Sequence, residues 1–90
     1  MNYQKIYFYD VESFSSFTCF TFLEKSSREI LQFKFGCGYN ELESLKSFTE
    51  DRALYVGFNS ISYDDPVLRF VLSQKTGVGI SKKVFDLSKR

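Results

Sequence analysis

The stretch from Val56 to Leu72, VGFNSISYDDPVLRFVL, limits the possible folds more than any other part of the sequence. The apolar run around its beginning, Leu54 to Phe58, has the length and composition of a short buried strand. A polar loop follows from Asn59. Asp65-Pro66 then predicts the start of a helix, because aspartate is a good N-cap and proline suits the first helical position. A strand, a loop and a helix in this order favour an α/β protein.

This stretch is also predicted to place polar side chains at the carboxyl end of its strand. Asn59, Tyr63 and Asp64 lie between the strand and the N-terminus of the helix. Ligands bind at such strand ends in open α/β sheets, which makes these three residues candidates for a functional site. Asparagine and aspartate are also common in plain turns, so the stretch alone leaves both interpretations open.

The rest of the sequence predicts a mixed α/β domain. Its segments show either the alternation typical of strands or the apolar spacing typical of helices. The expected elements are strands 5–9, 16–24 and 28–35, a helix over 41–50 capped by Asn40, strand 53–58, a helix from Pro66 to about Gln74, and a short strand over 84–87. The first three strands should form an antiparallel meander, and later strands should join in parallel through crossover helices.

Composition bounds the chemistry available to the chain. Ninety residues, of which 43% are hydrophobic and 19% aromatic, make one small ordered domain. There is no histidine, and the two cysteines, Cys19 and Cys37, lack the spacing of metal ligands. Zinc fingers, serine–histidine–aspartate triads and histidine acid–base catalysis are therefore excluded.

Charge and hydropathy bear on partners and location. The net charge is +1, but from Lys75 onward there are five basic residues and one acidic residue. Such a basic end can meet phosphate, and it can equally be a solvated terminus. The first residues do not have the pattern of a signal peptide, and no apolar run reaches membrane-spanning length. With the sparse cysteines, these features predict a cytoplasmic protein without a membrane partner.

Three acidic side chains are predicted to converge at one end of the sheet. Asp10 and Glu12 are two apart at the end of the first strand, so they share a face, and Asp64 abuts the neighbouring strand. Like charges so placed repel unless a cation or a base lies between them. Oxygen ligands in this number suit Mg²⁺ or Mn²⁺, and paired ions of this kind hydrolyse phosphodiesters without a histidine. The alternative is that these acids share no role.

The sequence around these acids resembles the ribonuclease H-like 3′–5′ exonucleases, the four-carboxylate group that includes the proofreading domains of DNA polymerases. YFYDVES is similar to the first motif of the family, and NSISYD is similar to its second motif, an Asn, a short spacer, an aromatic and an Asp. The hairpin and the single helix expected between the two motifs also match the family. Within the family, the sequence most resembles the exonuclease domains of phage and plasmid DNA polymerases. The resemblance extends over most of the chain.

The resemblance implies a ribonuclease H-like fold and a role for each motif residue. Asp10, Glu12 and Asp64 would be catalytic residues and ligands of Mg²⁺ or Mn²⁺. Asn59 and Tyr63 would position the 3′ end of a single-stranded nucleic acid, with DNA favoured and RNA left as the alternative.

The family's third motif is missing from the sequence. That motif, Tyr-x-x-x-Asp or His-x-x-x-Asp, supplies a fourth carboxylate, and the last tyrosine here is Tyr63. Asp86 lies in a segment similar to the family's next strand, but Lys82 stands four residues before it. Residues 1–90 are therefore interpreted as one partial exonuclease domain that is weak or inactive without a C-terminal exonuclease or polymerase segment. The alternative is a catalytically dead relative that binds a protein or a nucleic acid as a subunit.

An incomplete sheet of this kind is expected to leave an apolar face uncovered. The candidates for that face are Phe20, Phe22, Phe33 and Phe35. Exposed apolar patches mark interfaces, so we expect a homodimer or a partner subunit.

Overall fold

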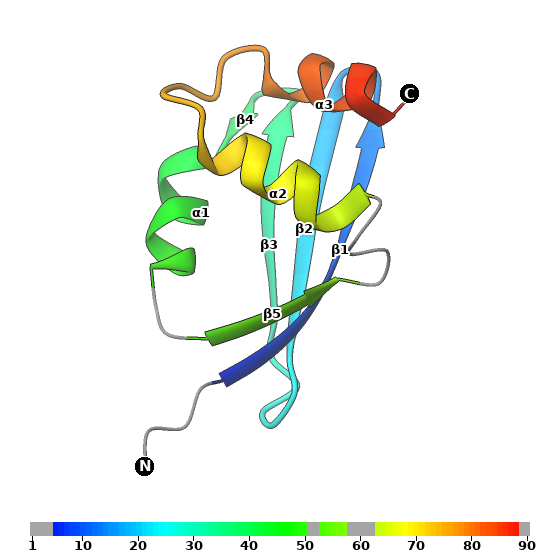
Figure 1. Ribbon diagram of the computed structural model, residues 1–90. Coiled ribbons are helices and arrows are strands. Elements are labelled where there is room, and N and C mark those ends of the chain that lie inside the picture. The colour runs from blue at the N-terminus through cyan, green and yellow to red at the C-terminus, as the bar shows by residue number, and fades with distance from the viewer. Residues whose placement is uncertain (1–4, 51–52, 58–62, 89–90) are drawn as a thin grey trace.

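The computed structural model describes residues 5–50, 53–57 and 63–88, and this part of the chain contains five strands and three helices. The strands are β1 (Lys5–Phe14), β2 (Phe17–Glu24), β3 (Ile30–Gly36), β4 (Tyr39–Asn40) and β5 (Ala53–Gly57), and the helices are α1 (Leu42–Thr49), α2 (Asp65–Leu72) and α3 (Ile80–Ser88). Figure 1 shows α2 crossing the sheet between α1 and α3. None of these described helices is long and apolar enough to span a bilayer.

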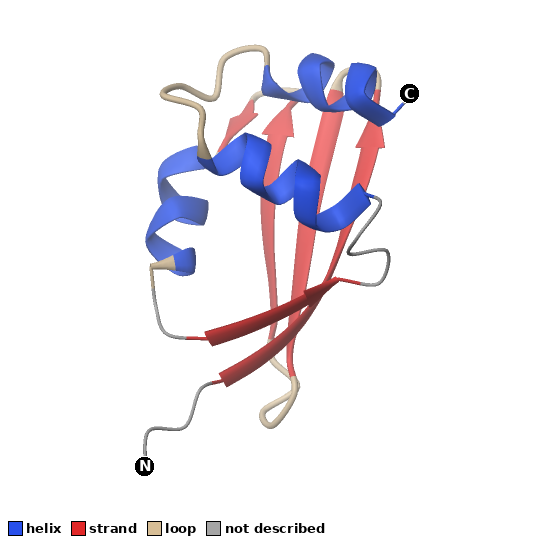
Figure 2. Cartoon of the chain, in the orientation of Figure 1, coloured by secondary structure: helices blue, strands red, loops and turns tan. Residues whose placement is uncertain are grey.

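The sheet is mixed, with the strand order β4-β3-β2-β1-β5. β1, β2 and β3 form an antiparallel meander, and β5 joins the free edge of β1 in parallel orientation. Parallel pairing needs a crossover, and α1 lies within the connection that leads to β5. Figure 2 shows the helices gathered on one side of the sheet. The predicted mixed α/β architecture is therefore confirmed.

One face of the sheet builds the core with the helices. Phe22 lies near its centre, and its ring meets five other aromatic rings with centroids 4.8 to 6.4 Å away. The buried strand residues on this face are Tyr7, Tyr9, Val11, Phe20, Phe22, Phe33 and Phe35, and the helices add Leu42, Leu45, Val67, Leu68, Val71, Ile80 and Val84. The prediction that these phenylalanines line an uncovered face is wrong, because the helices pack over them.

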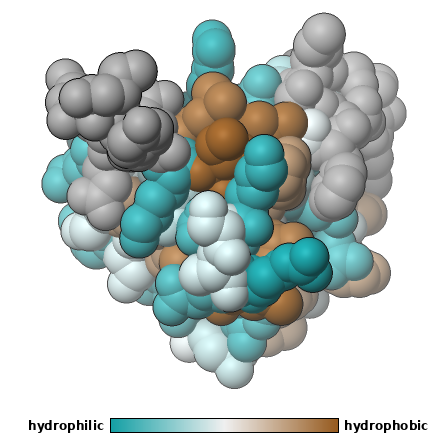
Figure 3. Space-filling model, turned by 90° about the horizontal axis from the view of Figure 1, so that it is seen from below, coloured by the Kyte–Doolittle hydropathy of each residue, from teal (hydrophilic) through white to brown (hydrophobic). Residues whose placement is uncertain are grey.

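The opposite face, called the open face here, carries no helix within the described part of the chain. Side chains alternate between the faces of a strand, which assigns the other strand residues to it. They are Ile6, Phe8, Asp10, Glu12, Phe14, Phe17, Cys19, Thr21, Leu23, Ile30, Gln32, Lys34, Leu54 and Val56. Ile30 is 62% exposed and Leu54 50%. Figure 3 shows apolar side chains exposed between polar ones at the lower end of the molecule.

Two local predictions are wrong. Residues 84–87 belong to α3 and not to a strand, because Ile80 and Val84 are one helical turn apart and both are fully buried against the sheet. Asn40 does not cap α1, because it pairs with β3, and the N-cap position falls on Glu41.

Candidate functional site

The chain returns to the sheet at Tyr63 and Asp64, immediately before α2. Asp64 is fully buried, and it packs closely on β5: a Cβ added to Gly57 would lie 2.7 Å from the Cβ of Asp64. Only glycine leaves room for this approach. Gly57 also pairs with Tyr9, the residue that precedes Asp10 on β1. The start of α2 is thus fixed at the carboxyl ends of the parallel pair β1 and β5.

A partly buried hydrogen bond joins β1 to α2. The hydroxyl of Tyr9 donates to Oδ1 of Asp65. Burial raises the pKa of the Tyr9 hydroxyl far above its ordinary value, and the bond and charge of Asp65 raise it further. The hydroxyl therefore stays protonated and remains a donor.

This bond overturns the predicted role of Asp65. The sequence predicted an N-cap at Asp65, but the cap position falls on Asp64, whose side chain makes no capping hydrogen bond. The carboxylate of Asp65 serves the hydroxyl of Tyr9 instead, since a buried hydroxyl needs an acceptor.

Tyr63 lies at the same end of the sheet and is half-buried. Burial raises the pKa of its hydroxyl, the neighbouring Ser13 hydroxyl lowers it, and the negative charges of Asp64 and Asp10 raise it again. The Tyr63 hydroxyl is therefore within electrostatic reach of both predicted acids.

Asp10 and Glu12 share the open face, as their spacing of two dictates. With Phe8, Thr21, Leu23 and Ile30 they line a cleft of about 370 Å³. Asp64 packs on Gly57 on the helix-covered face, so the sheet lies between it and the pair formed by Asp10 and Glu12. The structure brings two of the three predicted acids together and keeps the third apart.

The predicted Mg²⁺ or Mn²⁺ site stays a prediction, because Asp10 and Glu12 do not enclose an ion by themselves. Within the described ranges, no three carboxylates or thiols are grouped closely enough to hold an ion. Hard cations need several oxygen ligands around one point, and Asp10 and Glu12 supply two carboxylates from a single face. Asn59, the predicted partner of Tyr63, lies outside the described residues.

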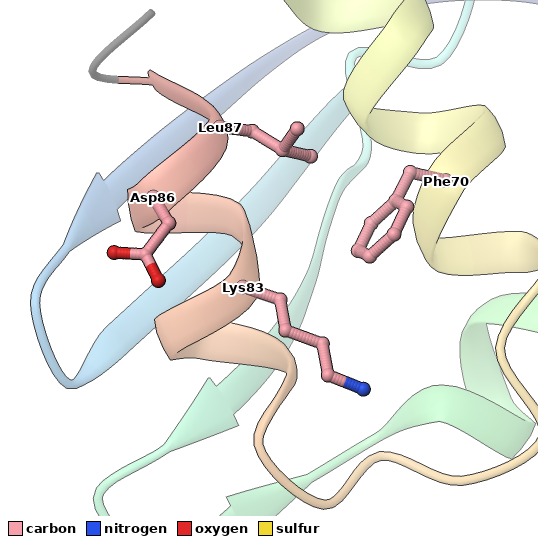
Figure 4. Close-up of a pocket in the computed structure, with 4 residues that line it drawn as sticks. All are labelled: Phe70, Lys83, Asp86 and Leu87. Carbon is pink, nitrogen blue, oxygen red and sulfur yellow. The ribbon is translucent and has the colours of Figure 1, made fainter.

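A second cleft, of about 240 Å³, lies between α2 and α3 and is lined by Phe70, Lys83, Asp86 and Leu87. In Figure 4, Phe70 of α2 faces Lys83 and Leu87 of α3, and Asp86 lies farthest from Phe70. The carboxylate of Asp86 binds the ammonium of Lys82 at 3.0 Å, and both side chains are at least half exposed. An exposed pair of this kind is a common surface feature and needs no functional explanation.

The sequence analysis missed the parts played by Tyr9 and Gly57. A glycine that ends a strand often marks the close approach of another segment, and a buried tyrosine needs a partner for its hydroxyl. Both signals are visible in the sequence. The partners are not, because pairing Gly57 with Asp64 and Tyr9 with Asp65 depends on how α2 docks.

Comparisons of the chain with models of protein families, with curated proteins and with solved structures found no match. Its function is therefore argued from the geometry of the site and from the sequence motifs.

Proposed function

We propose that the chain is the N-terminal portion of a ribonuclease H-like 3′–5′ exonuclease domain, of the proofreading kind found in DNA polymerases of phages and plasmids. The position of Asp64 carries the proposal. It rests on Gly57 at the end of β5, beside the point where β1 continues from Tyr9 to Asp10. The two sequence motifs, far apart in the chain, therefore meet at one end of the sheet.

The sheet supports the same proposal. An antiparallel meander whose first strand is joined in parallel by a later strand, through a helix, is what the resemblance to this family implies. A fold hosts many functions, so this likeness counts as analogy and the motifs carry the chemistry.

The proposed role of these residues is to bind the 3′ end of a single strand, DNA rather than RNA. In the family, Mg²⁺ or Mn²⁺ supplies the hydrolytic chemistry. Because Asp64 is separated from Asp10 and Glu12, no hydrolytic step is assigned to the described geometry. A C-terminal exonuclease or polymerase segment would have to provide the remaining ligand and draw the acids together.

The separation of the acids favours a second candidate function. The chain would then be a catalytically dead ribonuclease H-like module that acts as a binding subunit for a nucleic acid or a protein, or as a homodimer. Nuclease activity distinguishes the two candidates, since only the first gains it from an added segment.

The test uses single-stranded DNA labelled at its 5′ end, with Mn²⁺ present. The chain alone is expected to leave the DNA intact. Supplying a C-terminal exonuclease segment, in cis or in trans, should produce shortening from the 3′ end that Asp64→Asn abolishes. Asp65→Asn is the matched control and should retain the shortening. Shortening that survives Asp64→Asn contradicts the site assignment, and an intact label with every added segment favours the binding subunit.

A further inference from the structure

Three aromatic side chains form a row across the upper end of the open face. Phe14 of β1 pairs with Phe17 of β2, and the ring of Phe17 meets that of Tyr39 of β4 at 6.3 Å. Phe14 is 58% exposed and Tyr39 46%, while Phe17 is partly covered. These three residues, called the aromatic row, contribute little to the core, which lies on the other side of the sheet.

A cation accompanies the row. The ammonium of Lys34, on β3, lies 5.0 Å from the centroid of the Tyr39 ring, in the range of a cation–π contact. α3 reaches the same end of the molecule, because a Cβ on Gly36 would lie 2.9 Å from Oγ of Ser81. On the covered side of the sheet, this helix carries the exposed residues Lys82, which is paired with Asp86, and Lys83, so Lys34 is the cation that lies beside the row. Exposed rings and positive charge are thus combined at one end of the sheet.

We propose that the aromatic row and Lys34 form a base-stacking platform for single-stranded nucleic acid, a proposal that rests on the proposed function of binding a 3′ end. Proteins that hold single strands combine exposed aromatic rings, on which bases stack, with basic groups that meet the phosphates. Phe14 and Tyr39 each offer exposed ring surface to a base. Lys34, beside Tyr39, is positioned to meet the adjoining phosphate.

The place of the row on β1 links it to the acidic pair. Glu12 is two residues from Phe14 on the same face, a separation of about 7 Å along a strand. A nucleic acid whose bases stack on the row would thus lie beside Glu12, and repulsion between its phosphates and that carboxylate would favour placing the phosphates near Lys34. The aromatic row would bind the bases, and Asp10 and Glu12 would face the nucleotides next to the stacked ones.

Anisotropy of a fluorescein-labelled oligo(dT), titrated with the full chain in EDTA, tests the platform without metal. Phe14→Ala and Tyr39→Ala should each weaken binding by about 5- to 150-fold, the range for loss of one stacked base. Phe14→Trp should preserve binding, because any aromatic face can stack. Leu54→Ala is the control, since Leu54 is an exposed apolar residue of the same face that does not line the cleft of Asp10 and Glu12. Lys34→Gln should reduce the slope of log Kd against log salt by about one.

Each contrary result has a distinct meaning. Binding that Phe14→Ala and Tyr39→Ala leave unchanged overturns the platform while sparing the exonuclease proposal, whose readout is metal-dependent shortening. Equal losses in Phe14→Ala and Leu54→Ala overturn it as well, because they show general adhesion to an apolar face. If sedimentation shows that Phe14→Ala reduces self-association without changing oligo(dT) binding, the row is an interface between copies and the platform is wrong. Circular dichroism verifies that every variant is folded.

Discussion

On β1, Tyr7 and Tyr9 face the helices, whereas Asp10 and Glu12, on the same strand, face the other way. The tyrosines are at most 5% exposed and belong to a cluster of aromatic rings, while the acids line an open cleft. A covered Asp10 or Glu12 would lose its hydration without gaining a partner, which costs several kcal/mol for a charged group. The helices therefore pack on the face to which the middle of β1 contributes aromatic rings and no carboxylates.

The contrast also locates stability and function in different places. Burial of rings on the helix-covered face provides the free energy of folding, because burying apolar surface is the dominant favourable term. The open face keeps the carboxylates hydrated, but it also leaves apolar and aromatic surface in water, an unfavourable exposure that a binding role would explain. Substitutions on the two faces should accordingly have different consequences.

The largest effect is expected for Phe22→Ala on the covered face. Its ring is fully buried among five others, and removing it should lower the free energy of unfolding by about 3–5 kcal/mol. Phe14→Ala on the open face should change it by less than about 0.5 kcal/mol. Urea denaturation measures both, and Phe22→Leu provides a folded variant if the alanine variant unfolds. Similar losses for Phe22→Ala and Phe14→Ala would break the contrast between the faces.

A smaller loss, about 1–3 kcal/mol, is expected for Tyr9→Phe, because it removes the buried donor to Asp65. Tyr39→Phe is the matched control, since the Tyr39 ring is exposed on the open face. In a double-mutant cycle with Asp65→Asn, the two changes should couple by about 0.5–3 kcal/mol. Strict additivity in urea denaturation would show that the hydrogen bond makes no net contribution.

Gly57→Ala should destabilise the domain by about 1–3 kcal/mol, because its Cβ would collide with Asp64. The collision displaces Asp64, so the variant should also shift the amide resonances of Tyr63 and Asp64 in a proton–nitrogen NMR spectrum. Val56→Ala, which changes the adjacent open-face residue, should leave those resonances in place. An unperturbed Asp64 in Gly57→Ala would refute the close approach.

The smallest effect is expected at Glu24, a carboxylate at the end of the covered face. Its oxygens accept from the backbone N–H groups of Ser26 at 3.0 Å and Ser27 at 2.9 Å, and these bonds hold the pKa of Glu24 below its ordinary value of 4.5. A carboxylate whose pKa is lower in the folded state stabilises the fold at pH values above its pKa in the unfolded chain. This stabilisation is lost as the pH falls through the pKa of the folded state.

Thermal unfolding followed by circular dichroism at several pH values tests this sign. Glu24→Gln should melt below the wild type at pH 7, and the difference should close once the pH is well below 4.5. Glu43→Gln, at an exposed site on α1, should show no such closing. A difference that stays constant with pH would mean that the charge of Glu24 is irrelevant to the turn.

The first strands and helices could be predicted from the sequence because their signals are local. Alternating apolar residues and short turns define β2 and β3, and Pro66 marks the start of α2. Residues 84–87, VFDL, have the composition of a strand, yet they form a helix because Ile80 and Val84 pack on the sheet. Local propensity is weak in such short segments, and tertiary packing decides.

The candidate site could be predicted only where it depends on spacing along one strand. A separation of two puts Asp10 and Glu12 on the same face, and the structure has them there. Spacing does not say on which side of the sheet the chain returns after β5, so the place of Asp64 could not be derived. The pairing of the Tyr9 hydroxyl with Asp65 could not be derived either, because it depends on how α2 docks on the sheet.

The pairing of β1 with β5 determines the order in which the two edges of β1 become hydrogen-bonded during folding. β1 meets β2 through a short hairpin, whereas its other edge waits for a strand made much later, since Lys5 pairs with Ala53. Pairings so distant in sequence form slowly, and β1–β3 are synthesised before β5. During that interval the apolar segment KIYFY presents unpaired backbone groups, a template for adhesion to other nascent chains. Any delay in the docking of β5 on β1 would lengthen this interval and lower the yield of folded protein.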